Sequence, residues 1–300
     1  MKKPEDILID VQAQKHPLDN NYKFLSLLIP ADYPHVTIVA LDRPKKLNAI
    51  HAALWREIGH VFGQLGTLGD DCRCVLLTGS GRGFCAGIDI QDLSFTETES
   101  TTDDPARKGL AMIRKVKQMQ ACFSQLEQCP VPVVVAIHGV CVGAGIDLAC
   151  CADIRLCTPS ALFSVREVRM GLAADVGTLQ RLPKITGNDS LVNDVSLTGR
   201  NFTSEEARNM GFVSRLLQEE NFLGEALKVC QSIAMNSPIA VVGTKKALLY
   251  ARDHSVTDSL EQIISYNAMA LQSEDLPLSI AAAMQKQRAK FATIPAHSKL

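Results

Sequence analysis

The sequence lacks an excess of charge of either sign. Its 300 residues include 31 Lys and Arg against 32 Asp and Glu, which gives a net charge of −1 at pH 7. Proteins that bind nucleic acid or an anionic membrane surface through charge need a basic excess to neutralise phosphate groups. We therefore expect no nucleic-acid partner. The hydrophobic content of 46% is enough for the core of a soluble globular protein.

Metal-binding cysteine spacings and long apolar runs are also missing. The ten cysteines occur singly or as close pairs, and none forms a CxxC motif, so we expect no metal site. The most apolar region, residues 131–151, is interrupted by Pro132, His138, Asp147 and three glycines. This composition favours a buried strand, a turn and a helix over a membrane span.

The sequence does contain short β-branched or aliphatic runs that alternate with segments of helical spacing. We expect strands at 36–41, 75–78 and 133–137 and helices at 50–67 and 105–128. The second helix has a good start, because Asp104 is a favoured N-cap residue and Pro105 suits the first helical position. Alternating strands and helices predict an α/β core.

The last third of the chain follows a different pattern. Beyond about residue 186 the strand pattern stops, and we expect helices at 204–211, 238–252, 258–271 and 277–291. We therefore divide the chain into a core, residues 1–235, and a C-terminal helical region, residues 236–300, that wraps the core or builds an oligomer interface. Before this region, the acidic and hydroxyl-rich segment 94–104 predicts a surface loop, either a solvated connector or a lid over a site.

Two glycine-rich turns follow predicted strands, at 78–88 and 138–147. Neither ends in the Lys-Ser/Thr of a nucleotide-binding Walker loop. Turns of this kind can present bare backbone N–H groups at the start of a helix. Two such donors that converge on one carbonyl oxygen would form an oxyanion hole. From the spacing alone, simple tight turns are the favoured alternative.

Three acids lie in apolar surroundings: Asp147, Glu167 and Asp175. If residues 161–169 form a strand, Glu167 shares a face with two apolar residues. Burial would raise the pKa of these carboxyl groups, which suits acid–base chemistry near neutral pH. The alternative is that they cap helices or form salt bridges, since three arginines are close in sequence: Arg166, Arg169 and Arg181. We assign structural roles to three other charged residues, Asp89, Asp153 and Arg155.

In order along the chain, several short motifs together resemble the enoyl-CoA hydratase/isomerase (crotonase) superfamily. The resemblance covers about residues 25–291 and rests on Asp42-Arg43-Pro44, Leu47-Asn48-Ala49, Gly83-Phe84-Cys85-Ala86-Gly87-Ile88-Asp89, His138-Gly139, Ala152-Asp153-Ile154-Arg155, Leu197-Thr198-Gly199-Arg200 and Ser204-Glu205-Glu206-Ala207. The segment 167–184 is similar to the Δ3,5-Δ2,4-dienoyl-CoA isomerase branch of that family.

This resemblance implies a spiral of ββα units with a C-terminal helical region that makes trimers, usually paired into hexamers. It implies a fatty acyl-CoA substrate whose thioester oxygen is bound by the backbone N–H groups of Ile88 and Ala144. The neighbouring substrate-binding residues are then Ala86, Gly87, Gly143 and Gly145. No separate cofactor is implied, because CoA is part of the substrate.

The resemblance also implies roles for the three acids. Conversion of a 3,5-dienoyl-CoA to the 2,4-isomer removes a proton from carbon 2 and adds one at carbon 6. Asp175 would be the base at carbon 2 and Glu167 the acid at carbon 6, both in a dry pocket. Asp147 stands where hydratases keep a catalytic Glu, and its shorter side chain suggests a supporting electrostatic role.

Other activities on the same scaffold remain open alternatives. An enoyl-CoA hydratase would carry Glu at position 147 and a small or neutral residue at 175; a monoene isomerase is a close relative of this option. A catalytically silent CoA-binding protein would have lost at least one of the three acids. In a dehalogenase-like enzyme Asp175 would act as a nucleophile.

The basic residues and the last three residues suggest further contacts. Plausible partners for the CoA phosphates, with solvated surface as the alternative, are Arg43, Lys45, Lys286, Arg288 and Lys290. The tripeptide Ser298, Lys299 and Leu300 matches the address that peroxisomal import receptors bind. We therefore expect a peroxisomal protein.

Overall fold

The computed structural model describes residues 11–66, 71–95 and 103–295. The tripeptide at 298–300 and most of the segment 94–104 lie outside these residues. Within them, none of the helices is long and apolar enough to cross a membrane.

In the described part of the chain, seven strands form the main sheet in the order β1-β2-β3-β4-β5-β7-β10. From β3 to β10 neighbouring strands are parallel, whereas β1 and β2 are antiparallel additions at one edge. The central strands are completely buried, as expected of parallel strands covered on both faces. The strands are β1 (Ala13–Lys15), β2 (Leu25–Pro30), β3 (Val36–Leu41), β4 (Cys74–Gly79), β5 (Val133–Ile137), β7 (Ile154–Cys157) and β10 (Arg215–Leu216).

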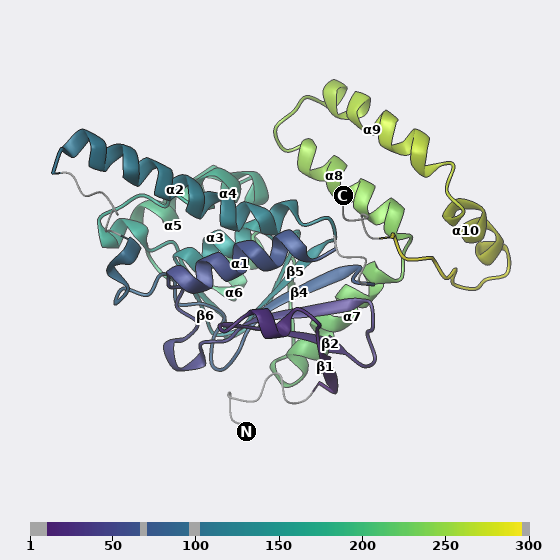
Figure 1. The fold of residues 1–300 in the computed structure, drawn as a ribbon, viewed down its shortest axis with the longest axis horizontal. Helices are drawn as coiled ribbons and strands as arrows, with labels where there is room; N and C mark the ends of the chain where they lie inside the picture. The colour runs from purple at the N-terminus through teal and green to yellow at the C-terminus, as the bar shows by residue number, and fades with distance from the viewer. Residues whose placement is uncertain (1–10, 67–70, 96–102, 296–300) are drawn as a thin grey trace.

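Helices cover both faces of this sheet (Figure 1). One face packs against α1 (Ala52–Gln64), α2 (Pro105–Gln128) and α3 (Ala144–Cys151), and the other packs against α7 (Phe222–Ala234). Trp55 of α1 and Phe123 of α2 stack with ring centroids 4.2 Å apart. The predicted cap is confirmed, because the Asp104 side chain accepts the Arg107 N–H at the start of α2.

A second, smaller sheet joins β6 (Val140–Val142), β8 (Leu162–Ser164) and β9 (Phe202–Thr203). The predicted strand at 161–169 is therefore too long. Its partner β6 ends at Val142, where Gly143 turns the chain away with a φ of +53°, so the ladder ends at Ser164. Glu167 instead begins the 3-10 turn Glu167–Met170.

The four helices expected in the C-terminal third are present as α6 (Ser204–Asn209), α8 (Pro238–Tyr250), α9 (Val256–Ala270) and α10 (Asp275–Met284). Three further helices were not predicted, namely α4 (Thr178–Thr186), α5 (Asp189–Thr198) and α7, and two short strands were also missed. The expectation that strands stop near 186 is wrong, because β9 and β10 follow. The helix predicted at 277–291 ends early, at Met284, and Lys286 then adopts a positive φ of +53°.

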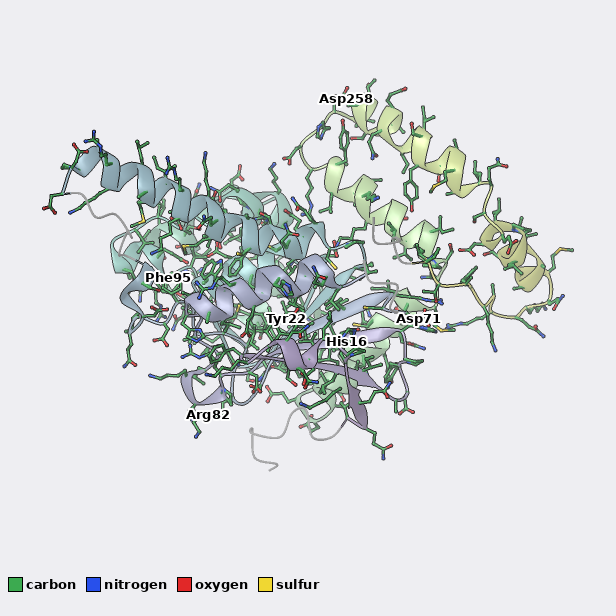
Figure 2. The ribbon with its side chains drawn as sticks, in the orientation of Figure 1. His16, Tyr22, Asp71, Arg82, Phe95 and Asp258 are labelled. Atoms are coloured by element: carbon green, nitrogen blue, oxygen red, sulfur yellow. The ribbon has the colours of Figure 1, made fainter. Side chains whose placement is uncertain are left out.

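Helices α8 to α10, which we call the C-terminal arm, stand to one side of the core (Figure 1). Lys245, which is buried, fixes α8 to the core through an ion pair with the half-buried Asp153 and a bond to the Val131 carbonyl. Asp258, near the start of α9, lies at the outer end of the arm (Figure 2). Apolar side chains remain exposed along α9 and α10, including Leu260, Ile264 and Ile280.

Candidate active site

The two glycine-rich turns lie against each other. Cys85 donates its N–H to Val140, and Val142 donates to Cys85, so the segment that leads to Ile88 runs beside the segment that leads to Ala144. Gly87 has a φ of +93°, and a Cβ added there would lie 3.0 Å from the Val142 carbonyl oxygen and 3.8 Å from the Ala144 nitrogen. A side chain at this position would therefore separate the two turns.

Ile88 and Ala144 have unused backbone donors. Among the described residues, no hydrogen bond uses the N–H of either one. Ala144 is the first residue of α3, where the helix dipole favours a negatively charged or polarised oxygen. Two adjacent, free N–H groups are what an oxyanion hole requires.

The neighbouring small residues keep this arrangement compact. The Ala86 N–H donates to the Leu47 carbonyl, which fixes the first turn. A Cβ on Gly145 would lie 3.0 Å from the side chain and carbonyl of Cys85, so the second turn could not approach as closely. Arg82, at the tip of the first turn, is exposed (Figure 2).

Asp147 is the most deeply buried of the three acids, with 1% of its surface exposed. Its Oδ1 accepts the Thr178 N–H at 2.6 Å, so it caps the first turn of α4. Burial and the negative charge of Glu167 raise the pKa of Asp147 to about 7, although the bond from Thr178 opposes the shift. The alternative that the acid caps a helix is therefore correct for Asp147. Asp147 is also a titratable group that interacts with the other two acids.

Glu167 is half-buried above the second glycine-rich turn. Its Oε1 lies 3.3 Å from the position that a Cβ on Gly143 would occupy. Its Oε2 is buried and has no hydrogen-bond partner among the described residues. Burial raises the pKa of Glu167, the charge of Asp175 adds to this, and the backbone N–H groups of Glu167 and Arg166 oppose it. A carboxyl group in this environment tends to keep its proton.

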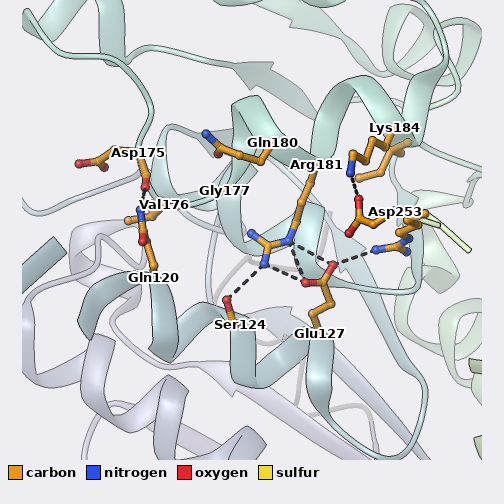
Figure 3. Close-up of a pocket in the computed structure, with 12 residues that line it drawn as sticks. Gln120, Ser124, Glu127, Asp175, Val176, Gly177, Gln180, Arg181, Lys184 and Asp253 are labelled. Carbon is orange, nitrogen blue, oxygen red and sulfur yellow. Dashed lines mark hydrogen bonds and ion pairs between the residues drawn. The ribbon is translucent and has the colours of Figure 1, made fainter. Parts of the chain in front are cut away.

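Asp175 is exposed, which differs from the expected dry pocket. Only its backbone is held, because the Gln120 side chain donates to its carbonyl at 2.6 Å. The carboxylate points away from the neighbouring ion pairs (Figure 3). The expectation failed because Asp175 follows Ala174 on a loop whose outer side no described part of this single chain covers.

The salt-bridge alternative is wrong for all three acids. Among the described residues, Arg166 bonds to Ser164 and Asn201, Arg169 bonds to the Thr198 carbonyl, and Arg181 pairs with Glu127. The charges of the acids instead act on one another: Glu167 and Asp175 both raise the pKa of Asp147. The structure therefore brings the three acids into one electrostatic group.

A cavity of about 360 Å³ begins at Asp175 (Figure 3). Its lining includes Gln120, Ser124 and Glu127 from one face of α2, and Arg181 from α4. The three α2 residues were not predicted from sequence, and Arg181 was named there only as a salt-bridge partner for the acids. The signal was available, because polar residues at 120, 124 and 127 recur with helical spacing along the otherwise packed half of α2.

The charged residues that we assigned to structural roles all form ion pairs or hydrogen bonds within the protein. Asp89 pairs with Arg43 at 3.0 Å, Asp153 pairs with Lys245, and Arg155 donates to the Phe212 carbonyl, so these three assignments to structural roles are confirmed. Arg43 is thus already partnered, whereas the remaining predicted phosphate partners are exposed: Lys45, Lys286, Arg288 and Lys290. The described residues contain no group of three or more His, Cys, Asp or Glu side chains that could hold a metal ion.

Comparisons with known proteins agree with this geometry. The sequence matches the enoyl-CoA hydratase/isomerase family over residues 32–292, so the chain belongs to that family. It is 41% identical to the mitochondrial Δ3,5-Δ2,4-dienoyl-CoA isomerase of Mus musculus, over 94% of this chain and 86% of the relative. It is 36% identical to the peroxisomal Δ3,5-Δ2,4-dienoyl-CoA isomerase of Arabidopsis thaliana, over 91% of this chain and 99% of the relative.

The fold is also shared with solved structures. A putative enoyl-CoA hydratase from Streptomyces coelicolor superposes with a TM-score of 0.80 at 28% identity, covering 94% of this chain and 97% of that one. The enoyl-CoA hydratase of Bacillus anthracis superposes with a TM-score of 0.79 at 25% identity, covering 90% and 99%. The chain therefore has the crotonase fold, a mixed α/β core with a C-terminal helical region.

Proposed function

We propose that this protein is a Δ3,5-Δ2,4-dienoyl-CoA isomerase of unsaturated fatty acid β-oxidation. The observation that carries the proposal is the group of three interacting acids beside two unused backbone N–H groups. The relatives that bear this name match most of the chain at 36–41% identity. The substrate is then a fatty dienoyl-CoA, and no further cofactor takes part.

The first step is removal of a proton from carbon 2. The thioester oxygen accepts hydrogen bonds from Ile88 and Ala144, and the carboxylate of Asp175 takes the proton. The electron pair moves into the thioester, which gives a trienolate, conjugated from carbon 1 to carbon 6, whose charge rests on the oxygen. Each donor of an oxyanion hole contributes about 3 to 4 kcal/mol to stabilising such a charge.

The second step is protonation at carbon 6. Glu167, whose raised pKa favours the protonated form, gives its proton to this carbon. The double bonds then lie between carbons 2 and 3 and between carbons 4 and 5. Asp175 returns its proton to solvent, which its exposure permits, and Glu167 takes up a new one.

The environment of Asp147 argues against a hydratase. A hydratase needs a carboxylate that holds a water molecule against the substrate. Asp147 is almost completely buried and its Oδ1 is bound to the Thr178 N–H. We propose that it supports the site by capping α4 and by its charge, and that water addition is not the main reaction.

A spectrophotometric assay with 3,5-octadienoyl-CoA tests the proposal. The purified protein should generate the absorbance of the conjugated 2,4-dienoyl-CoA. The matched variant Asp175→Asn should lose this turnover but still bind the CoA ester. Wild-type protein that hydrates crotonyl-CoA and leaves the diene unchanged would show that the proposed activity is wrong.

Assembly and location complete the proposal. The exposed apolar faces of α9 and α10 support a homo-oligomer, which we propose to be a trimer or a hexamer built from trimers.

We further propose a peroxisomal location, on the basis of Ser298, Lys299 and Leu300. The relatives named above are mitochondrial in mouse and peroxisomal in Arabidopsis. A fluorescent protein fused to the N-terminus should enter peroxisomes with these residues present and remain outside without them.

A further inference from the structure

Polar side chains on one face of α2 bind the segment that carries Asp175 and the helix that follows it. Gln120, Ser124 and Glu127 are spaced by four and three residues, so they lie on the same face of the helix (Figure 3). Gln120 donates to the Asp175 carbonyl at 2.6 Å. Four residues further along the helix, Ser124 accepts a longer bond, of 3.3 Å, from Arg181. The loop is thus attached to α2 at Asp175, and α4, which follows the loop, is attached to α2 through Arg181.

Glu127 makes the strongest of these attachments. Its two carboxylate oxygens accept from Nε and Nη2 of Arg181, with Nη2 at 2.8 Å. Arg181 in turn lies directly under the loop, because a Cβ on Gly177 would be only 2.0 Å from its Nη1. The Arg181 guanidinium therefore packs against the backbone two residues after Asp175.

Glu127 also contacts the C-terminal arm. Arg252, which follows α8, donates from Nη1 to Oε1 of Glu127 at 2.8 Å. Lys184 of α4 pairs with Asp253, the next residue of the arm. The turn between α8 and α9 is thereby fixed to both α2 and α4. Five charged side chains form this network, and Arg181 and Glu127 are the least exposed of them at 16% and 21%.

We propose that Glu127 is a positioning residue that couples the C-terminal arm to the acid–base segment through Arg181 and Arg252. The exposed apolar faces of the arm would be covered by neighbouring subunits in an oligomer. The position of the arm would therefore depend on those subunits. Because Glu127 binds both arginines, the position of the arm affects the position of Arg181 and hence of the loop that carries Asp175. This inference rests on the proposed isomerase function, in which Asp175 is the base.

Two variants test the coupling, with a matched control. Glu127→Gln removes the charge that joins both arginines, and Arg252→Gln breaks only the link to the arm. Arg208→Gln removes an exposed ion pair of the same length, with Glu205, in α6. A base displaced by about 1 Å can cost about 10²-fold in rate. We expect Glu127→Gln to lower kcat by up to that factor while KM changes by less than about twofold, and Arg208→Gln to change neither.

The two variants should act through one linkage. The double variant should therefore have the kcat of Glu127→Gln alone, because non-additivity is the signature of residues in one network. Amide hydrogen exchange of residues 172–177 should also become faster in both single variants and stay unchanged in Arg208→Gln. Hydrogen exchange does not require turnover, so it separates this proposal from the proposed function. If exchange is faster in the variants but the wild-type protein never converts the diene, Glu127 still positions the loop and the proposed isomerase function is wrong.

Three results would overturn the inference. The first is wild-type kcat in Glu127→Gln, and the second is unchanged hydrogen exchange at 172–177 in both variants. The third is a loss of kcat that merely follows the fraction of unfolded or dissociated protein, measured by thermal unfolding and light scattering on the same samples.

Discussion

Asp147 ionises differently in the folded and unfolded chain, which links its burial to stability. Its pKa is about 7 in the folded protein, whereas the ordinary value for Asp is 3.8. Between these values the folded state binds more protons than the unfolded state, so the free energy of unfolding falls as the pH rises from about 4 to 7. A shift of this size corresponds to about 4 kcal/mol.

The variant Asp147→Asn tests this linkage. Asn keeps an oxygen that can accept the Thr178 N–H but cannot ionise. Relative to wild type, the variant should become more stable by up to about 4 kcal/mol as the pH rises from 4 to 8. Denaturant unfolding at several pH values measures the difference, and a difference that does not depend on pH contradicts the assignment.

At the residue scale, three acids could be singled out from the sequence, and the structure places them in one electrostatic group, but their surroundings could not be predicted. Asp147, Glu167 and Asp175 stood out because carboxylates in apolar segments are expensive to bury. Their burial could not be predicted, because it depends on which segments cover them. Asp147 is covered by α4, Glu167 lies over a glycine turn, and Asp175 is exposed in the single chain.

The turn that carries Ala144 depends on a glycine at position 143. Gly143 has a φ of +53°, and an added Cβ would lie 3.3 Å from Oε1 of Glu167. Gly143→Ala should cost roughly 1 to 2 kcal/mol in backbone strain. It should also lower kcat by about tenfold or more, because both the Ala144 N–H and Glu167 are displaced.

Gly109→Ala is the matched control for this prediction. Gly109 lies inside α2, and an added Cβ would meet nothing within 4 Å. The change should stabilise the protein by about 0.5 to 1 kcal/mol and leave activity unchanged. Parallel measurements of thermal unfolding and initial rate compare the two, and full activity in Gly143→Ala would show that the turn is not part of the site.

Elements with a long, clear period could be predicted from sequence, and short ones could not. The helix at 105–128 was predicted with its bounds, since Asp104 and Pro105 mark its start and an apolar stripe repeats through it. The strand at 161–169 was overextended, because only its pairing with β6 determines where it ends. β9 and β10 contain two residues each, which is too short to show any period.

The C-terminal arm exposes apolar side chains that a single chain leaves in water. Leu260 of α9 is 62% exposed, and α8 and α9 enclose an open cavity of about 570 Å³ between them. Surfaces of this kind mark protein–protein contacts. Leu260→Glu should therefore dissociate the oligomer, as measured by light scattering. Lys228→Glu, an exposed substitution on α7, should keep the wild-type mass, and an intact oligomer in Leu260→Glu would place the interface elsewhere.

The family of the whole molecule could be predicted because motifs from distant parts of the chain occur in the right order. Their assembly into one site needed the structure: the turns that end at Ile88 and Ala144 are joined by bonds between residues 85 and 140–142. The link from Glu127 to Arg252 spans 125 residues, and no local pattern could have indicated it.

Isomerisation in D₂O, with deuterium located by NMR, tests the two-acid mechanism most directly. Wild-type protein should convert 3,5-octadienoyl-CoA to a 2,4-diene with deuterium at carbon 6. Glu167→Gln should exchange deuterium into carbon 2 of the substrate, while the 2,4-diene forms about 10² to 10⁴ times more slowly than in wild type. Asp175→Asn should neither exchange deuterium into carbon 2 nor form the 2,4-diene. Wild-type rates of diene formation in Glu167→Gln, with the label still at carbon 6, would contradict the account.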